Sequence, residues 1–143
     1  MWKIARFNDL TPRQIYDMYQ LRQKVFVIEQ NRLYNELDDT DLNVIHLLNY
    51  QDDQLVSYAR IFQEGHHVSF GRVVVDPEYR GMDLGSQLMR KILQTVEDWY
   101  PNQAIEIHAE NEAQDFYKKF GFTKVGDVII FNKTPHVKMV LNE

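Results

Sequence analysis

The sequence predicts an α+β domain in which helices cover both faces of a mixed, mostly antiparallel sheet of about seven strands. Strand-like and helix-like runs follow one another in the order βαβββαβαββ, which favours three α/β/α layers. Apolar residues recur at spacings of three and four in two long segments, as in amphipathic helices. The chain has 143 residues, enough to bury one core, so we expect a single domain over residues 1–143.

The N-terminal part combines an edge strand with a long helix. Trp2–Phe7 alternates in polarity and is the expected edge strand. Thr11 and Pro12 form a helix start, because threonine is a good N-cap and proline suits the first helical position. The spacing of the apolar residues predicts that this helix runs to about Gln30. A polar and acidic loop or short irregular helix is expected at Asn31–Leu42.

The middle of the chain predicts an antiparallel meander. Val44–Tyr50, Gln54–Gln63 and His67–Val75 are strand-like runs, and the short segments Gln51–Asp53 and Glu64–His66 separate them. Such short polar connections are typical of hairpins, so neighbouring strands are expected to run antiparallel.

A strand, a loop and a helix follow in close succession. The third strand of the meander stops at Pro77, and Glu78–Ser86 is a short loop that opens a periodic helix ending before Pro101. The apolar face of this helix contains Leu84, Leu88, Met89, Ile92, Leu93, Val96 and Trp99. A loop of this kind leaves unpaired backbone N–H groups at the positive end of the helix dipole. The sequence therefore predicts an anion or phosphate site at this junction.

The C-terminal part predicts three more strands and a short helix. Ala104–Ala109 alternates in polarity as a strand does, and Glu112–Phe120 is a short helix. Gly121 is placed to end that helix in the left-handed conformation. Thr123–Phe131 and His136–Leu141 are the last two strands.

Composition excludes several functional classes. The net charge of -5 argues against a nucleic-acid partner, which needs a basic face. The absence of cysteine excludes disulfides, thiol catalysis and thiolate metal sites. We expect a cytoplasmic protein with no membrane segment, because there is no signal core and no run of about 18 apolar residues. The scattered histidines lack the spacing of a metal site, so no metal is expected.

Two motifs resemble the GNAT superfamily of acetyl-CoA-dependent N-acetyltransferases. Arg80–Gly85 is similar to the family loop Arg/Gln-x-x-Gly-x-Gly/Ala, and Ala113–Phe122 is similar to Ala-x-x-Phe/Leu-Tyr-x-x-x-Gly-Phe. The order of elements also resembles the family over essentially the whole chain. The N-terminal half resembles the ElaA-like branch at Leu21–Gln30, Tyr34–Asp38, His46–Leu47 and Pro135–Val137.

The resemblance implies that acetyl-CoA is the co-substrate. Contacts with it would come from the strand and loop before the second long helix, and from one residue after the next strand. These residues are Val73, Val74, Val75, Arg80, Gly81, Met82, Asp83, Leu84, Gly85, Ser86 and Asn111. Asp83 stands where the family has a central glycine. A carboxylate beside the pyrophosphate would weaken binding by roughly 1 kcal/mol, with its side chain turned to solvent and Arg80 offsetting part of the charge.

The resemblance also implies a direct transfer of the acetyl group to a primary amine. Tyr117 matches the family tyrosine that acts as general acid toward the thiolate; the alternative is a core tyrosine. His108 and Glu110 lie with Glu106 on one face of a strand, because strand side chains alternate. Either residue is a candidate base. His108 could instead be a solvent-facing histidine, and ordered water could take the proton.

The acceptor is expected to be a small cationic amine or a protein amine. This expectation rests on the acidic segment 29–41; the alternative is a solvated acidic loop. The candidate substrate-binding residues are Arg22, Glu29, Glu36, Asp38, His46 and His136. Arg22 and Glu29 could instead pair with neighbours, and the histidines could be ordinary strand residues.

Two further alternatives stay open at this stage. The substitution at Asp83 favours a non-catalytic acyl-CoA sensor or interaction module with the same fold. Family resemblance also leaves open a homodimer, because members pair through sheet edges or C-terminal strands.

Overall fold

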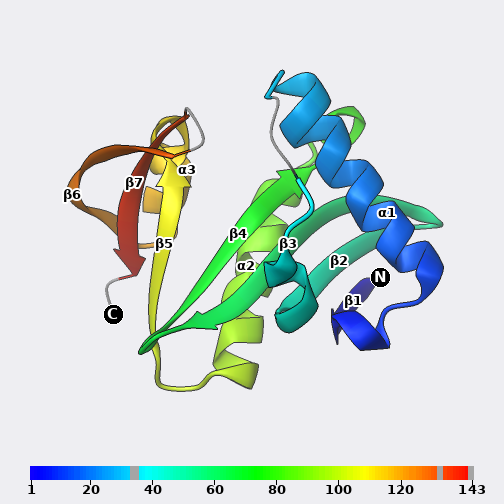
Figure 1. Ribbon diagram of the computed structural model, residues 1–143, viewed down its shortest axis with the longest axis horizontal. Helices are drawn as coiled ribbons and strands as arrows, with labels where there is room; N and C mark the ends of the chain where they lie inside the picture. The colour runs from blue at the N-terminus through cyan, green and yellow to red at the C-terminus, as the bar shows by residue number, and fades with distance from the viewer. Residues whose placement is uncertain (33–35, 132–133, 142–143) are drawn as a thin grey trace.

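The computed structural model describes residues 1–32, 36–131 and 134–141. The described strands form one sheet in the order β1-β2-β3-β4-β5-β7-β6 (Figure 1). They are β1 Trp2–Arg6, β2 Ile45–Gln51, β3 Gln54–Glu64, β4 His67–Val75, β5 Ala104–Glu110, β6 Phe122–Phe131 and β7 Thr134–Leu141. Only β4 and β5 pair in parallel among these strands. The predicted mixed, mostly antiparallel sheet is confirmed.

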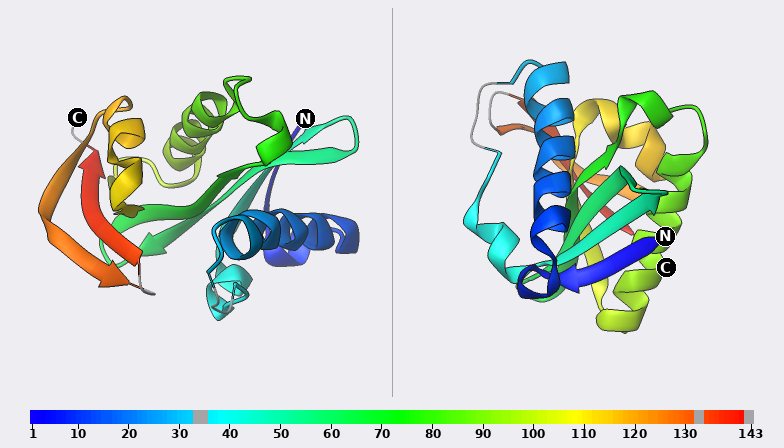
Figure 2. Two further views of the ribbon diagram at one scale, coloured as in Figure 1. Left: turned by 90° about the horizontal axis from the view of Figure 1, so that it is seen from above. Right: turned by 90° about the vertical axis from the view of Figure 1, so that its right-hand side faces the viewer.

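Helices cover both faces of this sheet, as predicted (Figure 2). The helix α1 Pro12–Arg22 lies on one face, and α2 Leu84–Trp99 lies with α3 Gln114–Lys118 on the other. The core on the α1 side includes Met18, Leu21, Val25, Leu48 and Tyr58. The core on the α2 side includes Leu88, Met89, Ile92, Ile61 and Ile107. No described helix combines the length and the apolar character that crossing a bilayer requires.

The first helix starts as predicted but changes its winding. Thr11 Oγ1 accepts a hydrogen bond from the backbone of Gln14, and the Gln14 side chain accepts one from the backbone of Thr11. This capping box satisfies two donors at the helix start. After α1 the chain continues as a π-helical segment, Gln23–Glu29, in which Gln30 N donates to Val25 O five residues earlier. The predicted length is therefore correct, whereas the wider turn leaves no local mark in the sequence.

Other predicted boundaries hold within two residues, apart from the last helix. The segment predicted as one helix over Glu112–Phe120 is a 3₁₀ turn followed by the shorter α3. Gly121 has the predicted positive φ, at 96°. The 3₁₀ turns are Phe7–Asp9, Asp39–Asn43, Pro77–Tyr79 and Asn111–Ala113. The predicted loop Asn31–Leu42 contains residues 33–35 and the linker between the last strands contains 132–133, which lie outside the described residues.

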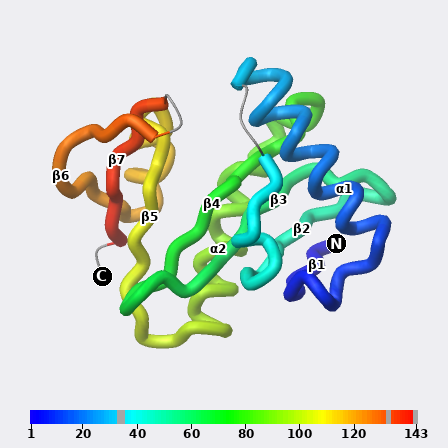
Figure 3. The backbone as a smooth tube through the Cα atoms, in the orientation of Figure 1, coloured from blue at the N-terminus to red at the C-terminus, as the bar shows by residue number. Residues whose placement is uncertain are grey.

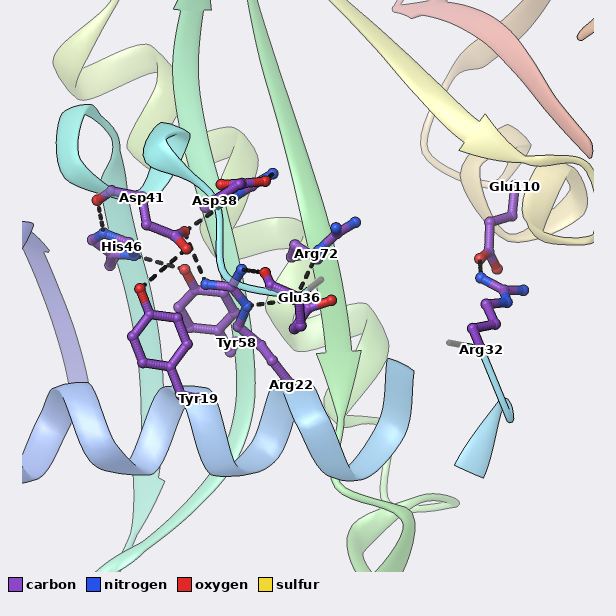
Figure 4. A network of polar contacts seen from close by, with 11 residues as sticks. Tyr19, Arg22, Arg32, Glu36, Asp38, Asp41, His46, Tyr58, Arg72 and Glu110 are labelled. Atoms are coloured by element: carbon purple, nitrogen blue, oxygen red, sulfur yellow. Dashed lines mark hydrogen bonds and ion pairs between the residues drawn. The ribbon is translucent and has the colours of Figure 1, made fainter. Parts of the chain in front are cut away.

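A buried network of charges connects α1 to the sheet (Figure 4). The fully buried Arg22 donates from Nε to Glu36 and from Nη1 to Asp41, both at 2.8 Å. Arg60 of β3 donates to Asp38 and to Asp41, at 2.8 and 3.0 Å. Burial alone would raise the pKa of Asp41, but the hydrogen bond and charge of Arg22, with help from Arg60, lower it below its usual value.

The network balances its charges. Its cationic members are Arg22, Arg60 and Arg72, and its anionic members are Glu36, Asp38 and Asp41. Loss of Arg22 therefore leaves one carboxylate charge uncompensated around Glu36 and Asp41, which are both buried. Removing one partner of a buried pair is much more costly than the pair's net contribution to stability.

We predict that Arg22→Met lowers the free energy of unfolding by about 3–5 kcal/mol, because methionine keeps the volume and removes the charge. Urea denaturation followed by circular dichroism measures this change. The control is Arg13→Met: the Arg13 side chain is 78% exposed and pairs with Asp17 on the surface of α1. Its loss should cost less than about 1 kcal/mol. Equal destabilisation by the two substitutions would contradict the prediction.

Candidate active site

The site begins where β4 and β5 separate. The two strands pair at His67 with Ala104 and at Val68 with Ile105. Beyond these pairs they diverge, and Figure 3 shows the widening gap along the backbone. Among the described residues, no strand pairs with this edge of β4 after Val68. Buried backbone polar groups need partners, so this edge can receive the hydrogen bonds of a bound molecule.

A β-bulge in β4 lies beside this gap. Arg72 and Val73 together lie opposite Ala59, because the register with β3 shifts by one residue at this point. Arg72 has a φ of 52°, in the left-handed region that non-glycine residues rarely adopt. Its Nε donates to Glu36 at 2.8 Å, and its guanidinium lies 5.4 Å from the ring centre of Phe26. A bulge bends its strand and increases the twist, which helps to open the cleft.

A cavity of about 230 Å³ lies in this cleft. Its walls come from the π-helical segment, β4, β5, α3 and the hairpin of β6 and β7. These elements are far apart in the sequence, so the cavity exists only in the folded chain. In the described part of the chain, no three His, Cys, Asp or Glu side chains gather closely enough to hold a metal ion.

Tyr117 of α3 lines this cavity. Its ring packs against Phe70, Phe116 and Phe122, with ring centres 5.3 to 6.1 Å apart. Burial raises the pKa of the Tyr117 phenol, and the negative charge of Glu110 raises it further. The hydroxyl therefore stays protonated at neutral pH and can donate a proton. The ring of Tyr117 can therefore pack in the core while its hydroxyl has a chemical role, although the sequence had presented these two interpretations as alternatives.

The strand β5 presents polar side chains to the cavity, and its predicted alternation is confirmed. The buried residues of this strand are Ile105, Ile107 and Ala109. His108 and Glu110 alternate with them and line the cavity. Glu110 forms an ion pair with Arg32 (Figure 4). Glu106 pairs with Lys138 of β7 at 3.2 Å and does not line the cavity. Two candidate bases thus lie in the same cavity as the Tyr117 hydroxyl.

The loop before α2 exposes backbone donors at the helix start. Gly81 and Asp83 have φ of 83° and 62°, so both are left-handed, and Asp83 is the N-cap residue. Gln87 N donates to Asp83 O at 3.1 Å. The N–H groups of Leu84–Ser86 precede this bond and have no acceptor within the helix. The Asp83 side chain is 65% exposed and lies 3.5 Å from Arg90, so it is turned to solvent as expected.

The same helix start lies beside α3. A Cβ atom on Gly85 would lie 3.5 Å from the ring of Phe116, which neighbours Tyr117 in the sequence. The N-terminus of α2 and the helix α3 that carries Tyr117 are therefore neighbours in the fold. An N-terminal helix dipole and open N–H groups together favour phosphate oxygens.

Residues 8–143 match the family described as Acetyltransferase (GNAT) domain. The chain belongs to the GNAT acetyltransferase family. Protein ElaA of Escherichia coli is 37% identical over 143 residues, which are 96% of this chain and 94% of that protein. This relative confirms the predicted ElaA-like branch of the GNAT family.

Solved structures agree with this assignment. The crystal structure of Escherichia coli ElaA matches with a TM-score of 0.93 at 37% identity over 99% of both chains. An acyl-CoA N-acyltransferase from Pseudomonas aeruginosa matches with a TM-score of 0.94 at 34% identity, also over 99% of both chains. An aminoglycoside 6'-N-acetyltransferase complexed with coenzyme A shares the fold, with a TM-score of 0.70 at 16% identity over 96% of this chain and 95% of that one.

The remaining residues predicted to contact the GNAT co-substrate have varied positions. Val73 lines the cavity, Val74 is buried on the α1 side, and Val75 pairs with Ser57 of β3. Met82 is 55% exposed beside the helix start. Asn111 follows β5 directly. Arg80 forms a two-pronged pair with Glu29, at 2.8 Å for each hydrogen bond.

Of the six residues predicted to bind the acceptor, only His136 lines the cavity. Its Nδ1 lies 2.9 Å from Thr134 O. Glu29 pairs with Arg80 at the surface. The other four, Arg22, Glu36, Asp38 and His46, belong to the buried network or contact it. We therefore do not assign these four to the acceptor site, because their polar groups face protein partners.

His46 fits the second of the two alternatives that the sequence left open, an ordinary strand residue. Its Nδ1 lies 2.6 Å from the Tyr58 hydroxyl and its Nε2 lies 2.8 Å from Asp41 O. Burial lowers the pKa of His46, so the ring stays neutral at pH 7. Such a histidine is a hydrogen-bonded part of the core, which sequence alone cannot distinguish from a pocket residue.

Three charged or amide residues that line the cavity were not predicted from the sequence. They are Gln30, Arg32 and Arg72. Arg72 did carry a signal, because it directly precedes a run of three valines in a predicted strand. The other two lie at the end of a helix and in a polar loop, where charged and amide side chains are ordinary.

We predict that Asp83→Asn tightens acetyl-CoA binding by about fivefold, which corresponds to roughly 1 kcal/mol of removed repulsion. Asparagine keeps the shape of the side chain and tolerates the left-handed backbone, so only the charge changes. Isothermal titration calorimetry measures the dissociation constant. Asp98→Asn, near the other end of α2, is the control and should leave the constant unchanged. An unchanged constant for Asp83→Asn would show that residue 83 does not meet the diphosphate.

Proposed function

We propose that this GNAT protein transfers the acetyl group of acetyl-CoA directly to a primary amine. The observation that carries the proposal is that Tyr117 lines the cavity between β4 and β5, on a helix that packs against the N-terminus of α2 through Phe116. Acyl transfer from a thioester needs a diphosphate site, a backbone edge for the pantetheine arm and a proton donor for the leaving sulfur. Each has a counterpart among the described residues.

Acetyl-CoA, the proposed co-substrate, could form hydrogen bonds with two sets of backbone groups that no described strand or helix satisfies. The N–H groups of Leu84–Ser86 would hold the pyrophosphate, since they precede the first hydrogen bond of α2. The edge of β4 around Val73 would pair with the pantetheine amides, because no described strand covers it. Acetyl-CoA supplies the activated thioester. The aminoglycoside acetyltransferase of the same fold was crystallised with coenzyme A, which supports this proposal by analogy.

The proposed chemistry needs one proton acceptor and one proton donor. The neutral amine attacks the thioester carbonyl, so a C–N bond forms and the C–S bond breaks. Tyr117 donates its proton to the departing sulfur. Glu110 or His108 accepts the proton that the amine loses, directly or through water. The proton then returns through solvent to Tyr117, and the products are an N-acetylated amine and CoA with a free thiol.

A sensor that binds acyl-CoA without turnover is the second candidate, and the negative charge of Asp83 beside the proposed diphosphate site favours it. A thiol-release assay with a panel of primary amines, run beside calorimetric titration of acetyl-CoA and CoA, separates the two. Release of thiol with any amine supports the enzyme. Binding without release supports the sensor, and absence of both would reject both proposals.

We predict that Tyr117→Phe lowers kcat by about 100-fold, within the range for loss of a general acid. The aromatic packing of the ring is kept, so the dissociation constant of acetyl-CoA should change by less than about twofold. Thiol release and calorimetry measure the two quantities. Tyr16→Phe is the matched control, because Tyr16 is 56% exposed on α1. Equal kcat for Tyr117→Phe and the unaltered protein would remove Tyr117 from the acid role.

The pH dependence provides an independent check on Tyr117. Because its pKa lies above the ordinary value of 10.0, the phenol should stay protonated as the pH rises through 7 to 10. We therefore expect no alkaline loss of kcat from this group below about pH 10. A falling limb below pH 10 that disappears in Tyr117→Phe would contradict the raised pKa.

A further inference from the structure

We infer that the acceptor is a small amine that also carries a carboxylate, as an amino acid does, held between Glu110 and Arg32. The inference rests on the proposed function and narrows its substrate class. It differs from the small cationic amine or protein amine that the acidic segment of the sequence had suggested, because it requires a carboxylate on the acceptor.

The cavity contains charged groups of both signs. Arg32, just after the π-helical segment, and Glu110, at the end of β5, form an ion pair between two separate walls of the cavity (Figure 4). Their side chains are 25% and 32% exposed, so the pair is partly buried. Arg72 adds a second guanidinium to the lining. A partly buried pair that spans a cavity can exchange partners with a molecule that enters it.

Two carboxylates of the acidic segment already have arginine partners. Glu36 binds Arg22 and Arg72, and Asp38 binds Arg60. Glu36 is buried, whereas the Asp38 side chain is 38% exposed. A polycation that entered the cavity would meet one carboxylate in its described lining, that of Glu110, and this carboxylate already pairs with Arg32.

Besides the Glu110 carboxylate, the side-chain oxygen of Gln30 can accept a hydrogen bond from the amine of the substrate. Gln30 lines the same cavity, and its Oε1 is buried without a hydrogen-bond partner among the described residues. An unsatisfied buried acceptor costs free energy, which a donor on a bound molecule would recover. The N–H groups of an amine can serve Gln30 Oε1 and the Glu110 carboxylate.

A zwitterionic acceptor keeps every charge paired. Its ammonium group replaces Arg32 at Glu110, and its carboxylate replaces Glu110 at Arg32, where a guanidinium binds it through two parallel hydrogen bonds. A simple amine would displace Arg32 from Glu110 and bring no carboxylate in exchange. The amide analogue of the amino acid would offer Arg32 an uncharged oxygen, which binds a guanidinium more weakly than a carboxylate does. The cavity of about 230 Å³ is also small, which favours a free amino acid over a bulky acceptor.

The test compares matched amines. Thiol release is measured at saturating acetyl-CoA with alanine, alaninamide and ethylamine, and with phenylalanine, phenylalaninamide and phenethylamine. Each kcat/KM is corrected for the fraction of unprotonated amine. In at least one set we expect the corrected kcat/KM of the amino acid to exceed that of both analogues by about tenfold or more. A site that pairs a charged group of its substrate discriminates against analogues that lack this group.

Variants at Arg32 then test whether this residue causes the preference for the amino acid over the amine. In Arg32→Gln the ratio of amino acid to amine should fall toward one, and in Arg32→Lys it should be intermediate, because lysine keeps the charge without the planar pair of donors. Arg13→Gln, on the exposed side of α1, should keep the original ratio. A preference that survives Arg32→Gln would overturn the inference.

The outcomes separate this inference from the proposed function. Turnover of amines without preference for the carboxylate overturns the inference and leaves acetyl transfer intact. Absence of thiol release with every amine rejects acetyl transfer. Calorimetric titration of the same compounds into the CoA-saturated protein then tests separately whether the zwitterion site exists. Binding of phenylalanine but not phenethylamine, lost in Arg32→Gln, supports the zwitterion site. No difference between the two compounds overturns it.

Discussion

The separation of β4 from β5 after two residue pairs is the constraint on which the site depends. A parallel pair that continued would satisfy the backbone groups of both strands and close the middle of the sheet. Here the bulge at Arg72 and Val73 bends β4 away, and aromatic side chains of α3 pack under the opening. The resulting cleft has a free backbone edge on one side and the polar face of β5 on the other. The proposed proton donor Tyr117 and the candidate bases His108 and Glu110 line this opening.

The buried charge network connects the stability of the fold to the shape of the cleft. Glu36 accepts hydrogen bonds of 2.8 Å from Arg22 of the first helix and from Arg72 of the bulge. One carboxylate thus holds both the helix and the strained residue that opens the strand. Glu36 and Asp41 of the acidic segment are for this reason internal counter-charges. Their partners are arginines from α1, β3 and β4, which no local pattern connects.

Local chemistry explains which parts of the fold and site were predictable. Thr11 and Pro12 set the helix start, Gly121 adopts the left-handed conformation, and β5 alternates as its polarity requires. The Tyr117 motif and the loop before α2 were recognisable because their residues are close together in the chain. The π-helical turn before Gln30 was not, because a small change in hydrogen-bond register leaves the apolar spacing intact.

By itself, the sequence determined the order and type of most elements, the family and the position of the tyrosine that we propose as proton donor. These depend on side chains that act on their own neighbours in the chain. Only the tertiary structure decided which charges face the cavity. The pairing of Arg32 with Glu110, and of Arg22 with Glu36 and Asp41, joins residues 14 to 78 positions apart. Coulomb interactions depend on distance in space, and the folded sheet and helices set that distance.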